Sequence, residues 1–360
     1  MHVLMIGRNT LNTSPGGDTV QIHSTAKYLR ALGVQVDVLL SWQEIDYSQY
    51  NLIHFFNIIR PDDILAHIQK SSLPFAVSTI FVDYSEYERN NRQGLLKLAT
   101  KIFNDDQLEY LKAIARYVKN GDKINSSFYL FKGHKASIRY IASKANILLP
   151  NSHNEYKRFV EKYQVKSNYL KVPNAIDTDT FDDFVQPNLQ FKNHILCVGR
   201  IEGRKNQLNL IKALDGTDFK LTLIGKPSPN HLSYYAECKN IVDKNSNMQI
   251  IEHIDHKELS SIYKAAKVHV LPSWFETTGL SSLEAAIMGC NIVVTKKGDT
   301  EEYFGDMAYY CNPEDILSIK EAVLKAFAEP LHNKLKENIL EKYTWQKAAA
   351  ETLKAYQSIL

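Results

Sequence analysis

The segment VHVLPSWFETTGLSSLEAAIMGC, residues 268–290, contains an apolar run, an aromatic loop and a second apolar stretch that ends in glycine. The run 268–272 is typical of a buried strand, and the pattern over 279–288 predicts a helix. Two glutamates lie eight residues apart, Glu276 in the loop and Glu284 one and a half turns inside the helix. Because carboxylates are rarely buried without partners, this strand–loop–helix unit indicates a binding site.

The same alternation of strand and helix continues along most of the chain. It predicts an α/β protein in which parallel sheets are joined by right-handed crossovers. The polar segment 174–193 loses periodicity and is the predicted linker. We therefore expect two Rossmann-like, doubly wound parallel-sheet domains facing a central cleft, 1–173 and 174–343, with a last helix, 344–360, packed back onto the first. The strands are expected at 2–6, 36–40, 52–56, 75–80, 147–150, 169–173, 194–199, 219–225, 248–251, 268–272, 291–295 and 307–311, and helices include 19–33, most of 95–144 and 205–214.

Composition narrows the class of protein. The chain has 360 residues, of which 44% are hydrophobic and 23% charged, as expected for a globular protein. No apolar run reaches the ~18 residues of a membrane helix, and the start MHVLMIGRNT reads as a strand rather than a signal peptide. The four cysteines form no CxxC pair, so we expect reduced core residues in a cytoplasmic protein and no zinc site.

The net charge of +3 is unevenly distributed. Residues 89–171 contain 17 Lys or Arg and 6 Asp or Glu, a surplus of 11 positive charges, which leaves −8 for the rest. This segment is either a solvated helical surface or a face for an anionic partner, such as a membrane surface or a lipid-linked phosphate. No nucleic-acid motif accompanies the basic residues, so nucleic acid is not the expected partner.

Two other strand ends carry groups suited to anions. Gly16 and Gly17 precede the first helix, for which Asp18 is the expected N-cap, and they permit close approach of a ligand to its N-terminus. Their pattern is not GxGxxG, which disfavours a nicotinamide cofactor. After the strand 194–199, Arg200 and Lys205 flank a loop, with Lys205 expected at the helix start, and together suit a diphosphate. The alternatives are a flexible glycine loop and two solvated cations.

The two glutamates suit hydroxyl-bearing ligands. Glu284 fits paired hydroxyls such as those of a ribose, and Glu276 fits a second polyol, a sugar. The alternative is a capping glutamate and an exposed helix glutamate. The triplet Asp177–Asp179 has the D-x-D form that metal-dependent sugar transferases use, but it lies in the predicted linker, so no metal site is expected.

Taken together, the motifs resemble those of the retaining glycosyltransferases of family 4, which have the GT-B fold. The segment 272–290 resembles the E-x7-E signature, VGRIEGRKNQ the diphosphate-binding segment, SPGGDT the N-terminal glycine loop and VPNAIDTDTF the hinge. The segment GDTEEYFGDMAYYCNPED and the closing helix also resemble the family. The likeness covers essentially all of the second half and only thinly the first.

The resemblance implies transfer of a sugar from a nucleotide-sugar donor, such as a UDP- or GDP-sugar, to a glycan or lipid-linked acceptor with retention of configuration, in polysaccharide or glycolipid biosynthesis. Catalytic roles then fall to Arg200, Lys205 and Glu276. The donor is a substrate, and no cofactor or metal is expected. The expected location is cytoplasmic, with peripheral association at the inner face of the membrane. The donor-binding residues would be Gly16, Gly17, Thr277, Thr278, Gly279, Leu280 and Glu284, with Lys226 and Ile254 bordering the base.

The chain departs from the family pattern at two places. Thr277 and Thr278 replace the usual Gly-Phe after the first glutamate, and Val82 precedes Asp83 where a histidine is common, which leaves Asp83 as the acceptor-side candidate. Two other functions remain open: a nucleotide-sugar 2-epimerase of similar fold, and a non-catalytic protein that binds nucleotide sugars or nucleic acid.

Overall fold

The computed structural model describes residues 1–360 except 14, 85, 88–104, 121–125, 183 and 332. The chain divides into two compact units, which are described separately. The first contains Met1–Pro173 and Trp345–Leu360, and the second contains Asn174–Thr344. Among the described residues, no helix is both long enough and apolar enough to cross a membrane.

The first unit is built on a five-stranded parallel sheet in the order β2-β1-β3-β4-β5. Its order is the doubly wound one in which the chain reverses direction across the sheet between β1 and β3. The strands are β1 His2–Gly7, β2 Gln35–Leu40, β3 Leu52–Phe56, β4 Phe75–Ser78 and β5 Ile147–Leu148. The helices described are α1 Gly17–Ala31, α2 Pro61–Ile68, α5 Asp105–Asn120, α6 Ser127–Lys144, α7 His153–Tyr163 and α15 Trp345–Gln357, with the 3-10 turn η1 at Tyr47–Gln49.

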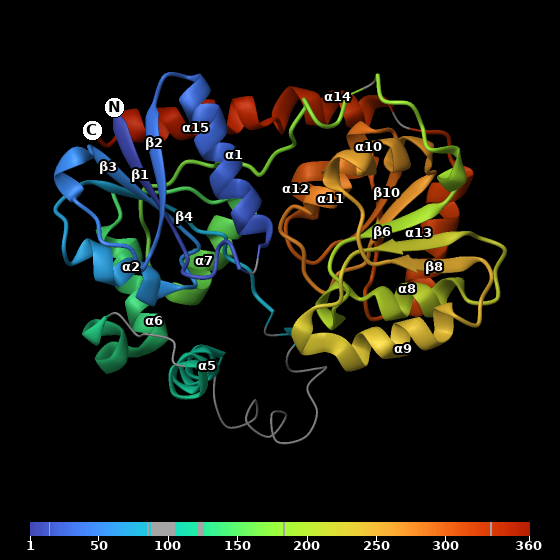
Figure 1. Cartoon of the computed structure of the whole chain (residues 1–360), viewed down its shortest axis with the longest axis horizontal. Helices are drawn as coiled ribbons and strands as arrows, with labels where there is room; N and C mark the ends of the chain where they lie inside the picture. Colours follow the sequence, from blue (N-terminus) through green and yellow to red (C-terminus); the bar gives the residue numbers. More distant parts are fainter. Residues whose placement is uncertain (14, 85, 88–104, 121–125, 183, 332) are drawn as a thin grey trace. The chain divides into compact units, whose positions relative to one another are not determined.

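The C-terminal helix α15 belongs to the first unit and packs against α1 (Figure 1). A buried polar link fixes it to the sheet. His54, in the middle of β3, places Nδ1 2.7 Å from the Tyr356 hydroxyl of α15 and Nε2 2.9 Å from the Ser78 hydroxyl of β4. All three side chains are buried, so both ring nitrogens of His54 have partners inside the protein.

The second unit has a six-stranded parallel sheet in the order β11-β10-β9-β6-β7-β8. Counted along the unit, this is the Rossmann order 3-2-1-4-5-6 read from its other edge, and the switch point lies between β6 and β9. The strands are β6 Ile195–Val198, β7 Leu221–Ile224, β8 Met248–Ile251, β9 Val268–Leu271, β10 Asn291–Thr295 and β11 Tyr309–Cys311. The helices are α8 Gln207–Leu214, α9 Leu232–Val242, α10 His256–Ala265, α11 Leu280–Ile287, α12 Thr300–Phe304, α13 Ile316–Ala328 and α14 Asn333–Lys342, with 3-10 turns η2 Leu189–Phe191, η3 Gly203–Lys205, η4 Pro229–His231 and η5 Gly305–Met307.

Both faces of this second sheet are covered by helices. Successive residues of β6 point to opposite faces, so Ile195 and Cys197 join the core under α8, α9 and α13, while Leu196 and Val198 join the core under α10, α11, α12 and α14. The two-sided burial explains why the strands read as continuous apolar runs. As predicted, all four cysteines are free and buried.

One predicted strand is wrong. The segment 169–173 makes only an isolated bridge, Leu148 to Tyr169, and β5 ends at Leu148 rather than at Pro150. Pro150 has no amide hydrogen, so the ladder cannot continue through it as donor. The segment is held instead by backbone bonds such as Val172 to Pro150, at 2.9 Å, and by stacking of Tyr169 on Tyr156, with ring centroids 3.7 Å apart.

Candidate functional site

The loop after β6 lies at the switch point of the second sheet, where ligands of such sheets bind. Arg200 is exposed there, and the amide of Ile201 donates to the Lys226 carbonyl at 3.0 Å, which ties this loop to the one after β7. Gly225 must be a glycine, because φ is +150° and a Cβ would collide with the carbonyl of Gly199. The backbones at the ends of β6 and β7 therefore lie too close together for a side chain at Gly225.

The predicted position of Lys205 needs correction. The helix α8 begins at Gln207, and Lys205 is the last residue of the 3-10 turn η3. The cause is Asn206, which adopts a left-handed conformation with φ of 61° and therefore cannot continue a helix. Its side-chain amide donates to the carbonyls of Pro272 and Pro313, at 3.1 and 2.8 Å, and so anchors the loop to the end of β9.

Lys205 and Glu276 are brought together by this arrangement. Lys205 Nζ lies 2.7 Å from Glu276 Oε2, and the Ser273 hydroxyl donates to the same oxygen at 3.1 Å. The backbone of Glu276 is fixed as well, because it forms a parallel bridge to Gly298. Glu276 is 9% exposed, so it is neither a solvated loop glutamate nor a helix cap. Its carboxylate is pre-oriented at the carboxyl end of β9.

Further charges surround this ion pair. Arg204 donates to both carboxylate oxygens of the buried Glu202, each at 3.2 Å. Burial favours the neutral acid, but Arg204, Arg200 and Lys205 outweigh it and lower the pKa of Glu202. The same excess of positive charge is felt by His231, whose pKa is lowered by burial, Arg204 and Arg200 against the pull of Glu202. The loop is thus cationic at neutral pH.

The residues after Glu276 form the turn into α11. Gly279 is the N-cap, with φ of +69°, and no side chain caps the helix, so the serines and threonines nearby pack rather than cap. Thr278 is buried, and its hydroxyl accepts from the Asn174 side chain at 3.4 Å. Thr277 and Leu280, the first residue of α11, are half-buried. The Thr277–Thr278 departure from the family pattern therefore leaves a closely packed turn.

Glu284 is not exposed on its helix, as the simpler interpretation would have it. Its side chain is 15% exposed, and both oxygens have partners on α10. His256 Nε2 lies 2.9 Å from Oε1, and the Tyr263 hydroxyl donates to Oε2 at 3.4 Å. The bond from Glu284 raises the pKa of His256, although burial opposes this. Ile254, two residues before α10, packs against the core beneath it.

Two further parts of the second unit were candidates, Lys226 and the D-x-D triplet 177–179. Lys226 follows β7 and its side chain is exposed. Asp177 of the D-x-D triplet accepts from the amide of Asp179 at 3.0 Å, as in a local turn. No group of three or more His, Cys, Asp or Glu within the described part of the chain is placed to hold a metal ion.

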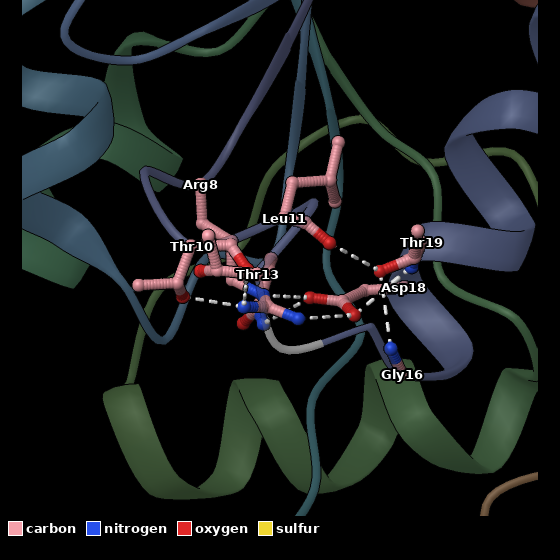
Figure 2. Close-up of polar contacts among 8 residues, drawn as sticks. Arg8, Thr10, Leu11, Thr13, Gly16, Asp18 and Thr19 are labelled. Carbon is pink, nitrogen blue, oxygen red and sulfur yellow. Dashed lines mark hydrogen bonds and ion pairs between the residues drawn. The ribbon is translucent and has the colours of Figure 1, made fainter.

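In the first unit, Gly17 is the first residue of α1 and Gly16 precedes it. Figure 2 shows Gly16 at the start of this helix. The predicted cap, Asp18, is wrong: Gly16 is the N-cap, because Asp18 is bound by Arg8 through Nε at 2.6 Å and Nη2 at 3.1 Å. Burial opposes ionisation, but these bonds lower the pKa of Asp18. Arg8 follows β1 directly, so the ion pair joins the strand end to the helix start and shapes the glycine loop.

Asp83, the acceptor-side candidate, accepts from Lys162 Nζ at 3.3 Å. Near it lies a carboxylate that sequence reasoning missed. Glu155 is fully buried at the start of α7 and accepts from the Thr79 hydroxyl and from the amides of Phe81 and Asn151 at 2.8 and 2.9 Å. Glu155 thereby joins the ends of β4 and β5 to α7.

The structure adds several other residues that the sequence reasoning did not single out. Glu202 and Asn206 lie within the quoted loop motif, and their roles depend on its irregular backbone. His256 lies outside any motif, two residues after Ile254, and only the packing of α10 on α11 brings it to Glu284. Arg8 and Ser273 are also new, and each follows a strand end.

The second unit is similar to known proteins in sequence, and the whole chain is similar to solved structures in fold. Residues 179–342, a little under half of the chain, match the family model for glycosyl transferases group 1. An uncharacterized glycosyltransferase of Methanocaldococcus jannaschii is 30% identical over 174 residues, which are 45% of this chain and 44% of that protein. The chain spans about half the length, or less, of the first curated relatives that it matches.

Solved structures extend the likeness to nearly every residue. Sucrose-phosphate synthase from Thermosynechococcus elongatus superimposes with a TM-score of 0.75 at 15% identity, over 99% of this chain and 98% of that one. The Anabaena protein HepE, solved with UDP and glucose, gives 0.70 at 13% identity over 99% and 100%. The chain therefore has the GT-B fold with two parallel-sheet α/β units, and residues 179–342 match the model of the group 1 glycosyl transferases.

Proposed function

We propose that the chain is a glycosyltransferase that moves a sugar from a nucleotide-sugar donor to a glycan, lipid-linked or other acceptor. The observation that carries the proposal is the cationic loop after β6, whose Lys205 is bonded to Glu276 at the switch point of the second sheet. An anion and a polyol can be held side by side at such a place. The matched family and the UDP and glucose bound to HepE support the same donor chemistry.

In this proposal the cationic loop holds the diphosphate of the donor. As the glycosidic bond breaks, negative charge develops on the leaving nucleoside diphosphate, and Arg200 and Lys205 stabilise it. Lys205 is held in place by Glu276, so its charge needs no reorganisation as the reaction proceeds. Backbone amides at Gly279 add donors for the same charge. Donor binding at Gly16 and Gly17 of the first unit stays a prediction from the sequence.

Glu276 contacts the transferred sugar. Its carboxylate is held by Lys205 and Ser273, so it offers a negative charge at a fixed place to a sugar that becomes positive as its bond breaks. Glu284 accepts from the paired hydroxyls of the donor ribose. The turn of Thr277, Thr278, Gly279 and Leu280 lines the donor, and Lys226 and Ile254 border the base.

The proposal also includes the family, the stereochemistry, the metal independence and the cellular location. The chain is a retaining enzyme of family 4 with Glu276 and Glu284 as its E-x7-E pair, it uses no metal or cofactor, and it acts in the cytoplasm. We place Asp83 on the acceptor side, where its carboxylate pairs with Lys162 at 3.3 Å. A cationic loop supports metal independence, because two or three fixed side chains supply the charge that a divalent ion would otherwise provide.

Nucleotide binding and transfer test the proposal. We expect one of UDP, GDP or ADP to raise the melting temperature of the second unit, since a ligand that binds only the folded state stabilises it. Arg200→Gln should abolish most of that shift, while Lys192→Gln, an exposed cation away from the loop, should keep it. The matching nucleotide sugar should then be consumed faster with an acceptor than by water. No shift with any nucleotide, or release of an epimerised sugar, would contradict the proposal.

The acceptor side carries the proposed membrane contact. Part of the basic segment 89–171 lies outside the described residues, but the start of α6 is described. Phe131 there is 85% exposed and Leu130 43% exposed, next to the exposed Lys132, Lys135 and Arg139. The backbone at Gly133 is non-helical, with φ of 76°, so these apolar residues occupy a turn of their own. Exposed apolar side chains on a helix that also exposes cations suit an anionic lipid surface.

Vesicle binding tests this contact with a matched control. Binding should increase with the fraction of anionic lipid and decrease with salt, because the Debye length falls to about 3 Å at 1 M. Phe131→Ala should weaken it, whereas Phe184→Ala removes an equally exposed phenylalanine, 90% exposed in the second unit, and should not. Equal losses in both variants, or binding that ignores salt, would contradict the assignment.

A further inference from the structure

A pair of side chains on one face of α10 holds the carboxylate of Glu284. His256 and Tyr263 are seven residues apart, which is two helical turns, so both point the same way. Each contacts a different oxygen: His256 Nε2 is 2.9 Å from Oε1, and the Tyr263 hydroxyl is 3.4 Å from Oε2. Tyr263 is fully buried, whereas the side chain of His256 is 58% exposed and Glu284 lies between them at 15%.

The hydrogen-bonding capacity left on Glu284 matches a particular ligand. Each carboxylate oxygen has about two acceptor directions. With one direction of each oxygen taken by α10, one remains on each oxygen. Because α10 holds both oxygens and so orients the carboxylate, the remaining direction on each oxygen suits one of two neighbouring hydroxyl groups that donate together.

The environment of His256 favours this role over a chance surface contact. The rings of His256 and Phe181 pack nearly at right angles, with centroids 5.1 Å apart, so the imidazole is held by Phe181 as well as by Glu284. The charged groups that act on it are Glu284 and Asp177, which both favour the protonated ring. On its own helix it is followed by Lys257 and Glu258, and Asp255 before it faces another histidine, His253, at 3.4 Å.

We propose that His256 is a positioning residue that orients the Glu284 carboxylate toward the vicinal hydroxyls of the donor ribose. The inference rests on the proposed function, because it adds a residue to the same donor site. It goes beyond the motifs, since nothing in the pattern around Glu284 marks a histidine on the preceding helix. A purely structural alternative would have His256 join α10 to α11 without any effect on the nucleotide.

The experiment has two independent arms. In the first, the ring of His256 is titrated by NMR in the free protein. The pKa should lie above 6.5 and should fall in Glu284→Gln, because the neutral amide removes the charge that holds the proton. An unchanged pKa would show that the contact is not formed in solution and would overturn the inference without touching the proposed function.

In the second arm, calorimetry measures the dissociation constants of UDP, GDP and ADP. For the nucleotide that binds, His256→Ala should raise the dissociation constant about five- to tenfold, within the value of one ordinary hydrogen bond, because the contacts of Glu284 with the ribose are misaligned rather than removed. His256→Gln should restore it to within about twofold, because the amide still donates to the carboxylate. The control His253→Ala should change nothing, since that ring faces Asp255 instead.

Kinetics separates positioning from stability. His256→Ala should raise KM for the nucleotide sugar and change kcat little, as ribose contacts act equally in the ground state and the transition state. An unaltered dissociation constant in His256→Ala, beside a weakened Glu284→Gln, would overturn the inference alone. Failure of the wild-type chain to bind any of the three nucleotides would overturn the proposed function and this inference together.

Discussion

Acidification should destabilise the first unit through His54. This side chain lies in the middle of β3, where burial lowers its pKa to about 3, against about 6.5 in an unfolded chain. Between these values the unfolded chain binds a proton that the folded unit does not. Stability therefore falls as the pH falls below 6.5, and the stabilising contribution of neutral His54 is complete only above that value.

The size of the effect follows from the two pKa values. One unit of pH inside the window changes the free energy of unfolding by about 1.4 kcal/mol for one proton. Because the onset at 6.5 is gradual, the change from pH 7 to pH 5 amounts to about 2 kcal/mol. That is a large share of the stability of an ordinary domain. Tyr356 and Ser78 cannot offset it, since neither carries a negative charge to pair with the imidazolium.

Hydrogen exchange provides the assay, because two compact units need not unfold together. The opening free energy of β3 amides should be measured at pH 7 and pH 5 in the wild type and in His54→Gln. Carboxylates titrate alike in both proteins, so their contribution cancels in the comparison. We expect the variant to lose about 2 kcal/mol less than the wild type over this interval. Equal losses in the two proteins would refute the reasoning.

The second unit supplies an internal control. His269, in β9, is also fully buried, and its pKa is lowered to about 3 by burial, with Lys205 adding to the effect. Amides of β9 should therefore show the same pH dependence in the wild type and in His54→Gln, because His269 is intact in both. A change at β9 would mean that the two units open as one, and the loss of stability at β3 would then not belong to the first unit alone.

Three further outcomes are expected. Glu276→Gln should lower kcat about ten- to a hundredfold with little change in the affinity for the free nucleoside diphosphate, whereas Glu284→Gln should mainly weaken that affinity. Kinetics and calorimetry on both variants measure the two effects, and equal losses of affinity would contradict the division of roles. Activity should survive EDTA, since Arg200 and Lys205 supply the positive charge; a complete loss reversed by Mg²⁺ or Mn²⁺ would instead implicate a metal. Gly298→Ala should destabilise the second unit by roughly 1–3 kcal/mol in urea unfolding, because φ is +115° and a Cβ would collide with the Glu276 carbonyl; an unchanged midpoint would contradict the geometry.

Local pattern predicted the elements well where burial and periodicity agree. The apolar runs at 248–251 and 291–295 form strands with those bounds, and the closing helix is displaced by only one residue at its start. Such segments are predictable because a parallel strand covered on both faces needs a continuous apolar run, whatever its neighbours are. The loop after β6 and the stretch around Glu276 were also correctly identified as strand ends.

The errors occurred where the deciding interaction lies far away in the sequence. Asp18 has the chemistry of a helix cap, but an arginine ten residues earlier binds it. Lys205 precedes a helical pattern, but the left-handed Asn206, anchored to carbonyls at 272 and 313, delays the helix. The segment 169–173 has the composition of a strand, but the neighbouring strand β5 ends at Leu148, just before Pro150.

Some features of the candidate site follow from the sequence, and others depend on the tertiary structure. Strand-end position follows from sequence, since periodicity marks where each strand stops and parallel strands share one carboxyl edge. Which strands are neighbours does not follow, because the orders β2-β1-β3-β4-β5 and β11-β10-β9-β6-β7-β8 depend on contacts between residues tens of positions apart. Only that order joins Lys205 to Glu276 across 71 residues and His256 to Glu284 across 28. Side-chain pairing across helices and strands is a property of the packed core, and no local propensity records it.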